Sequence, residues 1–187
     1  NKCDTISKAT NLANSPITYD NIATDWEDAT SEYAKQYADE ELSWSNLKDL
    51  TDVELYNCPK LTQIPEFVYD LPELQLLNVA CNKGISADQL TADWKRLADD
   101  EDTGPKVQIL YLGYNNLEKF PESESLRKMV KLGLLDCVHN NVNHLEAFGT
   151  DVKLSDLMLS YNQIEEIPDE FCAFTDQVEG LGPVSSS

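Results

Sequence analysis

Apolar and polar residues alternate in five short segments that share one pattern, Leu-x-Leu-x-x-Asn or a close variant. The segments begin at Val53, Leu77, Leu110, Leu135 and Leu157, so they are 24, 33, 25 and 22 residues apart. Strict alternation predicts a strand whose two apolar residues point into a core while the intervening residues face water. A single strand of this kind cannot bury its apolar edge alone, so the units are expected to stack on one another.

Each unit also carries signals for its turn and return stroke. The predicted inward pairs are Val53/Leu55, Leu77/Val79, Leu110/Leu112, Leu135/Cys137 and Leu157/Leu159. Three residues later the chain has Cys58, Asn82, Asn115, Asn140 and Asn162 in turn. A buried asparagine can bond backbone groups of neighbouring units where the strand ends, whereas cysteine does so only weakly. Apolar-proline pairs at Ile64-Pro65, Phe120-Pro121 and Ile167-Pro168 then predict the start of each return stroke.

The longest unit contains a predicted helix. Ser86 is placed to cap the segment "ADQLTADWKRLA", in which Leu90, Trp94 and Leu97 share one face, and a Gly-Pro pair at 104–105 ends the excursion. Four acids follow the helix at residues 99–102, but their spacing does not match a calcium-binding loop. We interpret this acidic run as a solvated loop.

The two ends of the chain differ from the middle. The segment "ITYDNIATDW" from Ile17 matches "ISADQLTADW" from Ile85, which predicts a divergent helical repeat over about residues 11–46. Residues 1–46 are therefore expected to be a capping unit and residues 47–175 the repeat domain. Residues 176–187 begin like a sixth repeat, but Pro183 falls in an inward slot, so a truncated repeat or a disordered tail is expected. We interpret the chain as a fragment of a longer solenoid or as one with a non-contiguous tail.

Composition excludes several classes of function. The 187 residues carry 34 acids and 14 bases, a net charge of −20, which makes nucleic acid and anionic lipid poor partners. No apolar run approaches the length of a membrane span, so we expect no membrane insertion. We also expect the protein to be a monomer. The five cysteines form no Cys-x-x-Cys pair. Cys58, Cys137 and Cys172 are expected to be buried, Cys3 and Cys81 accessible, and we predict neither a metal site nor a cofactor.

The repeats resemble leucine-rich-repeat proteins of typical length over roughly residues 47–173. The segments "ELYNCPKLTQIP", "ADDEDTGPK" and "LGLLDCVHNNVNHLEAFGT" are similar to surface leucine-rich-repeat proteins of gut Bacteroidetes. This resemblance implies an α/β solenoid with a curved parallel sheet on the concave face and helices and irregular turns on the convex face. It also implies a bacterial cell-surface or secreted setting, and it brings no catalytic residues.

The candidate site is the set of residues that the strands display on the concave face. Leu76, Ile109 and Leu134 occupy one slot in three successive strands and form an apolar stripe. Tyrosines surround this stripe, which is typical of interaction surfaces. The predicted binding residues are Glu54, Tyr56, Leu76, Asn78, Ile109, Tyr111, Tyr114, Leu134, Asp136, His139, Met158 and Tyr161. The stripe could alternatively pack under a neighbouring loop or domain.

The function predicted from these residues is non-catalytic recognition of a protein or peptide, with a glycan as a further candidate. One alternative is that Asp136 and His139 form an acid-base pair, but an open sheet lacks the water-excluding pocket that such a pair needs. The sequence also lacks a Gly-x-Ser-x-Gly elbow, a phosphate loop and a His-Glu-x-x-His helix. Two further alternatives are a recognition domain of a larger surface enzyme and a purely structural spacer.

Overall fold

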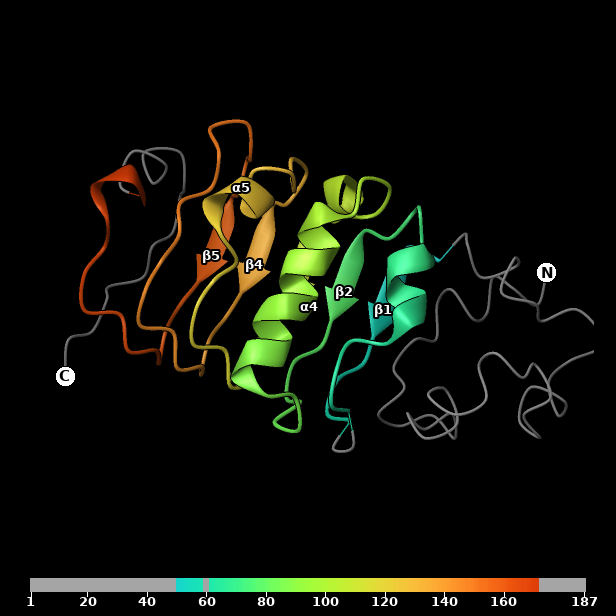
Figure 1. The fold of residues 1–187 in the computed structure, drawn as a ribbon, viewed down its shortest axis with the longest axis horizontal. Coiled ribbons are helices and arrows are strands. Elements are labelled where there is room, and N and C mark those ends of the chain that lie inside the picture. The colour runs from blue at the N-terminus through green and yellow to red at the C-terminus, as the bar shows by residue number, and fades with distance from the viewer. Residues whose placement is uncertain (1–49, 59–60, 172–187) are drawn as a thin grey trace, which may run out of the picture.

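The computed structural model describes residues 50–58 and 61–171. Five parallel strands pair in chain order to form one sheet (Figure 1). The strands are β1 (Asp52–Glu54), β2 (Leu76–Asn78), β3 (Ile109–Tyr111), β4 (Leu134–Asp136) and β5 (Asp156–Met158). The predicted capping unit at residues 1–46, the tail at 176–187, Cys3 and Cys172 lie outside the described residues.

Helices lie in three of the four return strokes between the strands of the described residues. They are η2 (Glu66–Asp70), α4 (Ala87–Asp99), η3 (Gly104–Lys106) and α5 (Ser123–Leu126). In Figure 1, α4 and α5 lie on the same side of the sheet, as parallel strands joined by right-handed crossovers require. None of the helices in the described part of the chain has the length and apolar character needed to span a membrane. The five parallel strands paired in chain order, with helices on one side of the sheet, confirm the predicted α/β solenoid.

The inward residues form one continuous core between the sheet and the return strokes. All five predicted inward pairs lie in this core, and nine of their ten side chains are buried. Leu159, the second inward residue of the fifth unit, is only half-buried, although it packs against the core. Within the described residues β5 has a strand on one side alone, which leaves this side chain less covered than its equivalents.

Buried asparagines join one unit to the next at the strand exits. Asn82 Oδ1 accepts the N–H of Cys58 at 2.7 Å, and its Nδ2 donates to the carbonyls of Leu55 and Val79 at 2.7 and 2.8 Å. Asn115 repeats this arrangement one unit later, with its Oδ1 2.6 Å from the N–H of Asn82. Its Nδ2 donates to one carbonyl of its own unit and one of the preceding unit.

The last two asparagines bond backbone groups slightly further along the preceding unit. Asn140 Oδ1 accepts the N–H of Leu117, and Asn162 Oδ1 accepts the N–H of Val142, both at 2.9 Å. Cys58 occupies the same slot in the first unit, and among the described residues its Sγ approaches the Tyr56 carbonyl of its own unit at 3.8 Å. The predicted bridging by asparagine is confirmed. The weaker bonding predicted for cysteine stays a prediction, because the unit expected before Cys58 lies outside the described residues.

Helix α4 begins and packs as predicted. The Ser86 side chain accepts the N–H of Gln89, and Leu90, Trp94 and Leu97 are fully buried against the core. Asp93 shares the buried face without having been predicted there. Its Oδ2 accepts the N–H of Ile64 at 2.7 Å, which ties the helix to the preceding return stroke, and burial raises the pKa of this carboxyl.

The interpretation of residues 99–102 as a solvated loop was partly wrong. Asp99 is the last residue of α4, and its carboxylate bridges Lys95 at 2.5 Å and Lys128 at 2.8 Å. These two lysines hold the pKa of Asp99 down at about 2. Asp100 Oδ1 accepts the N–H groups of Asp102 and Thr103 and so organises the turn. The sequence did not reveal the bridge because Lys128 belongs to the next unit.

We predict that Asn115→Ala and Asn140→Ala each lower the free energy of unfolding by about 1–3 kcal/mol, because each leaves several buried backbone groups unpaired. Urea unfolding followed by circular dichroism measures the change. Asn143→Ala, at an exposed position, is the control and should unfold like the wild type. Urea unfolding curves of the two asparagine variants that overlay the curve of the wild type would refute the structural role.

We predict that Asp99→Asn lowers stability by roughly 1 kcal/mol at neutral pH, the partial exposure of the pair limiting the effect. The folded pKa of Asp99 lies below its unfolded value of about 3.8, so the carboxylate stabilises the fold above that value. The difference from wild type should hold from pH 7 to about pH 5 and shrink as the pH falls below 3.8 toward 2. Asp102→Asn, at an exposed position, is the control and should leave the urea midpoint at neutral pH unchanged.

Candidate functional site

Strand register places the outward side chains of the concave face in rows that cross the sheet. The first outward residues pair as Asp52 with Leu76, Leu76 with Ile109, Ile109 with Leu134, and Leu134 with Asp156. The second outward row is Glu54, Asn78, Tyr111, Asp136 and Met158. Every predicted binding residue from the strands therefore lies in one of two adjacent rows.

The apolar stripe lies at the centre of the first row. Leu76, Ile109 and Leu134 follow one another on neighbouring strands, about 4.8 Å apart, and each is half-buried. Asp52 and Asp156 continue the row at its two ends. The predicted alignment of the stripe is confirmed, whereas its role in binding stays a prediction.

The second row contains side chains that also organise their own strand exits. Asn78 Oδ1 accepts the N–H of Ala80 at 3.0 Å, and Asp136 Oδ1 accepts the N–H of Val138 at 2.9 Å. No hydrogen bond or ion pair of the described residues joins Asp136 to His139. Instead the Asp136 carboxylate bonds backbone, so the acid-base alternative gains no geometric support.

A third set of residues forms a rim where the strands end. The residue immediately before the asparagine slot has a positive φ in all five units: Asn57 (52°), Cys81 (62°), Tyr114 (57°), His139 (52°) and Tyr161 (61°). Such angles are uncommon for residues other than glycine, and here they recur at every strand exit. The backbone thus presents one side chain per unit along the same edge of the concave face.

Three of these rim residues stack their rings across three units. The Tyr114 and His139 ring centroids are 4.3 Å apart with planes at 19°, and those of His139 and Tyr161 are 4.1 Å apart at 11°. Tyr161 at the end of this aromatic rim is 74% exposed. Tyr56, also exposed, lies beside Cys81, whose side chain raises the pKa of the Tyr56 phenol.

Sequence reasoning selected the three rings but missed the stack. The signal was available, because Tyr114, His139 and Tyr161 all stand immediately before the asparagine of their unit. Sequence reasoning also left Asp52 and Asp156 out of the predicted binding residues, although each occupies the same slot as the residues of the apolar stripe. Aligning the units column by column would have found both features.

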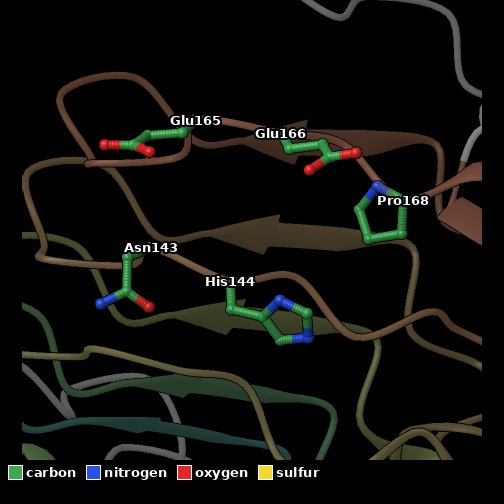
Figure 2. Close-up of a pocket in the computed structure, with 5 residues that line it drawn as sticks. All are labelled: Asn143, His144, Glu165, Glu166 and Pro168. Carbon is green, nitrogen blue, oxygen red and sulfur yellow. The ribbon is translucent and has the colours of Figure 1, made fainter.

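A separate pocket of about 390 Å³ lies away from the concave rows. Figure 2 shows its lining on two neighbouring loops, with Asn143 and His144 on one loop and Glu165, Glu166 and Pro168 on the other. The two glutamates point in different directions, and His144 Nε2 lies 3.5 Å from Glu146 instead. Among the described residues, no group of three or more His, Cys, Asp or Glu side chains is arranged to hold a metal ion. The pocket therefore supports no specific chemistry.

Comparison with known proteins identifies the repeat. The leucine-rich-repeat family model matches residues 153–174. A leucine-rich-repeat protein from Bacteroides thetaiotaomicron is 81% identical, with a TM-score of 0.75, over 90% of this chain and 20% of that one. A similar protein from Bacteroides eggerthii is 59% identical, with a TM-score of 0.69, over 82% of this chain and 25% of that one. This chain thus spans a fifth to a quarter of the length of these relatives.

More distant structures share the fold alone. A leucine-rich-repeat protein from Leptospira interrogans is 20% identical with a TM-score of 0.55, over 87% of this chain and 45% of that one. Comparison with curated proteins gives no match.

We predict that His139→Val destabilises the protein by about 1–2 kcal/mol more than His139→Asn does. Both variants lose the ring stack, but a β-branched residue is poorly tolerated at φ 52°, whereas asparagine adopts this conformation readily. Urea midpoints of the two variants give the comparison. Leu134→Val and Leu134→Asn, at a strand position where valine is favoured, are the control pair, in which valine should not be the worse substitution. Equal midpoints for the two His139 variants would show that the backbone conformation is not strained.

Proposed function

Since this chain belongs to the leucine-rich-repeat proteins, we propose that its concave face is a non-catalytic binding surface for a protein or peptide. The observation that carries the proposal is the alignment of Leu76, Ile109 and Leu134 on three neighbouring strands. These apolar side chains stand on a sheet face that has no helix over it among the described residues. A partner that covers them would remove apolar surface from water, which is worth about 25 cal/mol per Å².

The surroundings of the stripe favour a macromolecular partner. Tyr111 lies in the next row, exposed Tyr114 and Tyr161 follow along the rim, and exposed Tyr56 stands immediately before the rim residue Asn57. Tyrosine provides large contact area with few rotatable bonds and a hydroxyl for hydrogen bonding, so it is enriched in binding sites. Together the rows form a broad, open surface, which suits an extended peptide or a protein better than a small molecule that needs enclosure.

Catalysis receives less support from the same residues. Asp136 bonds the backbone of its own strand, and His139 stacks between two tyrosines. Neither arrangement encloses a reacting atom or excludes water from it, as acid-base chemistry requires. A catalytic domain elsewhere in a longer protein stays compatible with a recognition role for this domain, because the match covers only a fifth to a quarter of the related Bacteroides chains. A cell-surface or secreted setting belongs to the proposal as well.

We predict that Ile109→Ser with Leu134→Ser weakens binding at least tenfold, because a few central apolar residues carry most of the energy of an interface. The probe is a displayed library of random 12-residue peptides selected on the immobilised 187-residue chain, with affinities of the selected peptides measured by titration. Circular dichroism establishes that the variant is folded.

Val130→Ser is the matched control, because Val130 is an exposed apolar residue outside the concave rows. It should bind like the wild type. Selected peptides that bind the stripe variant with undiminished affinity would rule out the concave face as the site.

A further inference from the structure

The concave face has a one-sided charge. Its two outward rows carry the carboxylates of Asp52, Glu54, Asp136 and Asp156. Of the described residues, no lysine or arginine occupies an outward strand slot or a rim position. Desolvating four carboxylates under a partner without cations would be costly, so the face is poorly suited to a neutral or acidic occupant.

Four cations of the described residues pair with acids away from the concave rows. Lys95 and Lys128 both pair with Asp99 at the end of α4, which lies on the convex side. Arg96 Nη1 and Nη2 hold both oxygens of Glu66 at 2.8 Å, and Lys106 Nζ lies 2.9 Å from Glu73. By contrast, no ion pair of the described residues involves a carboxylate of the concave rows. Within the described part of the chain these carboxylates therefore have no cationic partner.

The two ends of the apolar stripe are built alike. At one end the Thr51 hydroxyl donates to Asp52 Oδ2 at 2.7 Å. At the other end the Ser155 hydroxyl lies 2.9 Å from both Asp156 Oδ2 and the Gly133 carbonyl, and its single proton serves one of them at a time. In each case a hydroxyl of the preceding residue lies beside Oδ2 and leaves Oδ1 to accept from another donor. Three apolar side chains therefore stand between two similarly held carboxylates.

The aromatic rim adds a second feature that suits cations. Tyr114 and Tyr161 of the rim are exposed, as is Tyr56 beside it, and aromatic rings attract lysine and arginine side chains. The cation–ring contact recorded among the described residues is that of Arg96 over Tyr69, which lies on the convex side. Tyr114 and Tyr161 each stack one ring face on His139, and the exposed parts of the tyrosine rings offer further contacts to cations of a partner.

Building on the proposed function, we propose that the occupant of the concave face is an extended basic polypeptide segment. Its apolar side chains cover the stripe while two lysine or arginine side chains reach Asp52 and Asp156. Four strand spacings separate these acids, about 19 Å, which an extended chain spans in about six residues. The segment therefore carries cations about six positions apart, with apolar residues two and four positions after the first. The net charge of −20 attracts such a segment over a distance.

The test uses the same random 12-residue peptide library and the 187-residue chain. Selected peptides should carry paired lysine or arginine at this spacing, and peptides with glutamate in their place should fail to bind. Asp52→Asn with Asp156→Asn should weaken binding roughly 3- to 10-fold, as the loss of two partly exposed ion pairs implies, and added salt should weaken it similarly. Glu101→Gln with Asp151→Asn, at exposed positions outside the concave rows, is the control and should have no effect.

A gain of function separates this proposal from simple loss of fold. Asp52→Lys with Asp156→Lys should reverse the preference, so that glutamate-bearing peptides bind and lysine-bearing ones do not. Peptides whose binding depends on Ile109 and Leu134 but ignores all these charge changes would overturn the basic segment and leave the proposed function intact. Neutral oligosaccharides that bind across the stripe, in place of any basic peptide, would also overturn the basic segment. Failure of every peptide to depend on the stripe would overturn both.

Discussion

The buried asparagine at each strand exit is the constraint on which the geometry of this protein depends. A three-residue strand makes few ladder bonds, and the turn that follows it leaves backbone groups with no regular partner. One asparagine side chain offers an acceptor oxygen and two N–H donors, so it can satisfy three such groups at once. Because Asn82, Asn115, Asn140 and Asn162 each bond both their own unit and the preceding one, neighbouring units cannot slip relative to each other.

That fixed register converts positions within the repeat into rows across the sheet. A slot that holds an apolar residue in three units becomes a stripe, and a slot that holds a ring in three units becomes a stack. The residue before each asparagine is held at positive φ, a conformation that costs about 1–2 kcal/mol for residues other than glycine. The asparagine bonds on either side over-determine the turn and so maintain this conformation. The strained backbone at the strand exits thus directs the side chains of neighbouring units toward one another along the rim.

The sequence predicts what depends on periodicity and misses what depends on neighbours. The inward pairs, the bridging asparagines, the cap at Ser86 and the alignment of Leu76 with Ile109 all follow from slots within one repeat. Burial of Asp93 did not follow, because its partner, the N–H of Ile64, is 29 residues away. The bridge from Asp99 to Lys128 was missed for the same reason. Positive φ at His139 had no local signal, since the residue is not glycine. The residues of the two outward rows could be listed from the sequence. Whether their carboxylates have cationic partners could be judged only from the positions of the lysine and arginine side chains.

Those cations explain why the two faces differ. On the side opposite the strands, four cations of the return strokes pair with acids of a neighbouring unit. They are Lys95, Arg96, Lys106 and Lys128. Pairs of this kind lie at the surface and contribute little stability individually. Their larger effect is on the charge distribution, because bases used on the convex side are absent from the concave rows. A chain with more than two acids per base then presents carboxylates and tyrosines around its apolar stripe without any internal counter-ion among the described residues. The sign of the charge that a partner meets on the strands is therefore that of the acids in the outward slots.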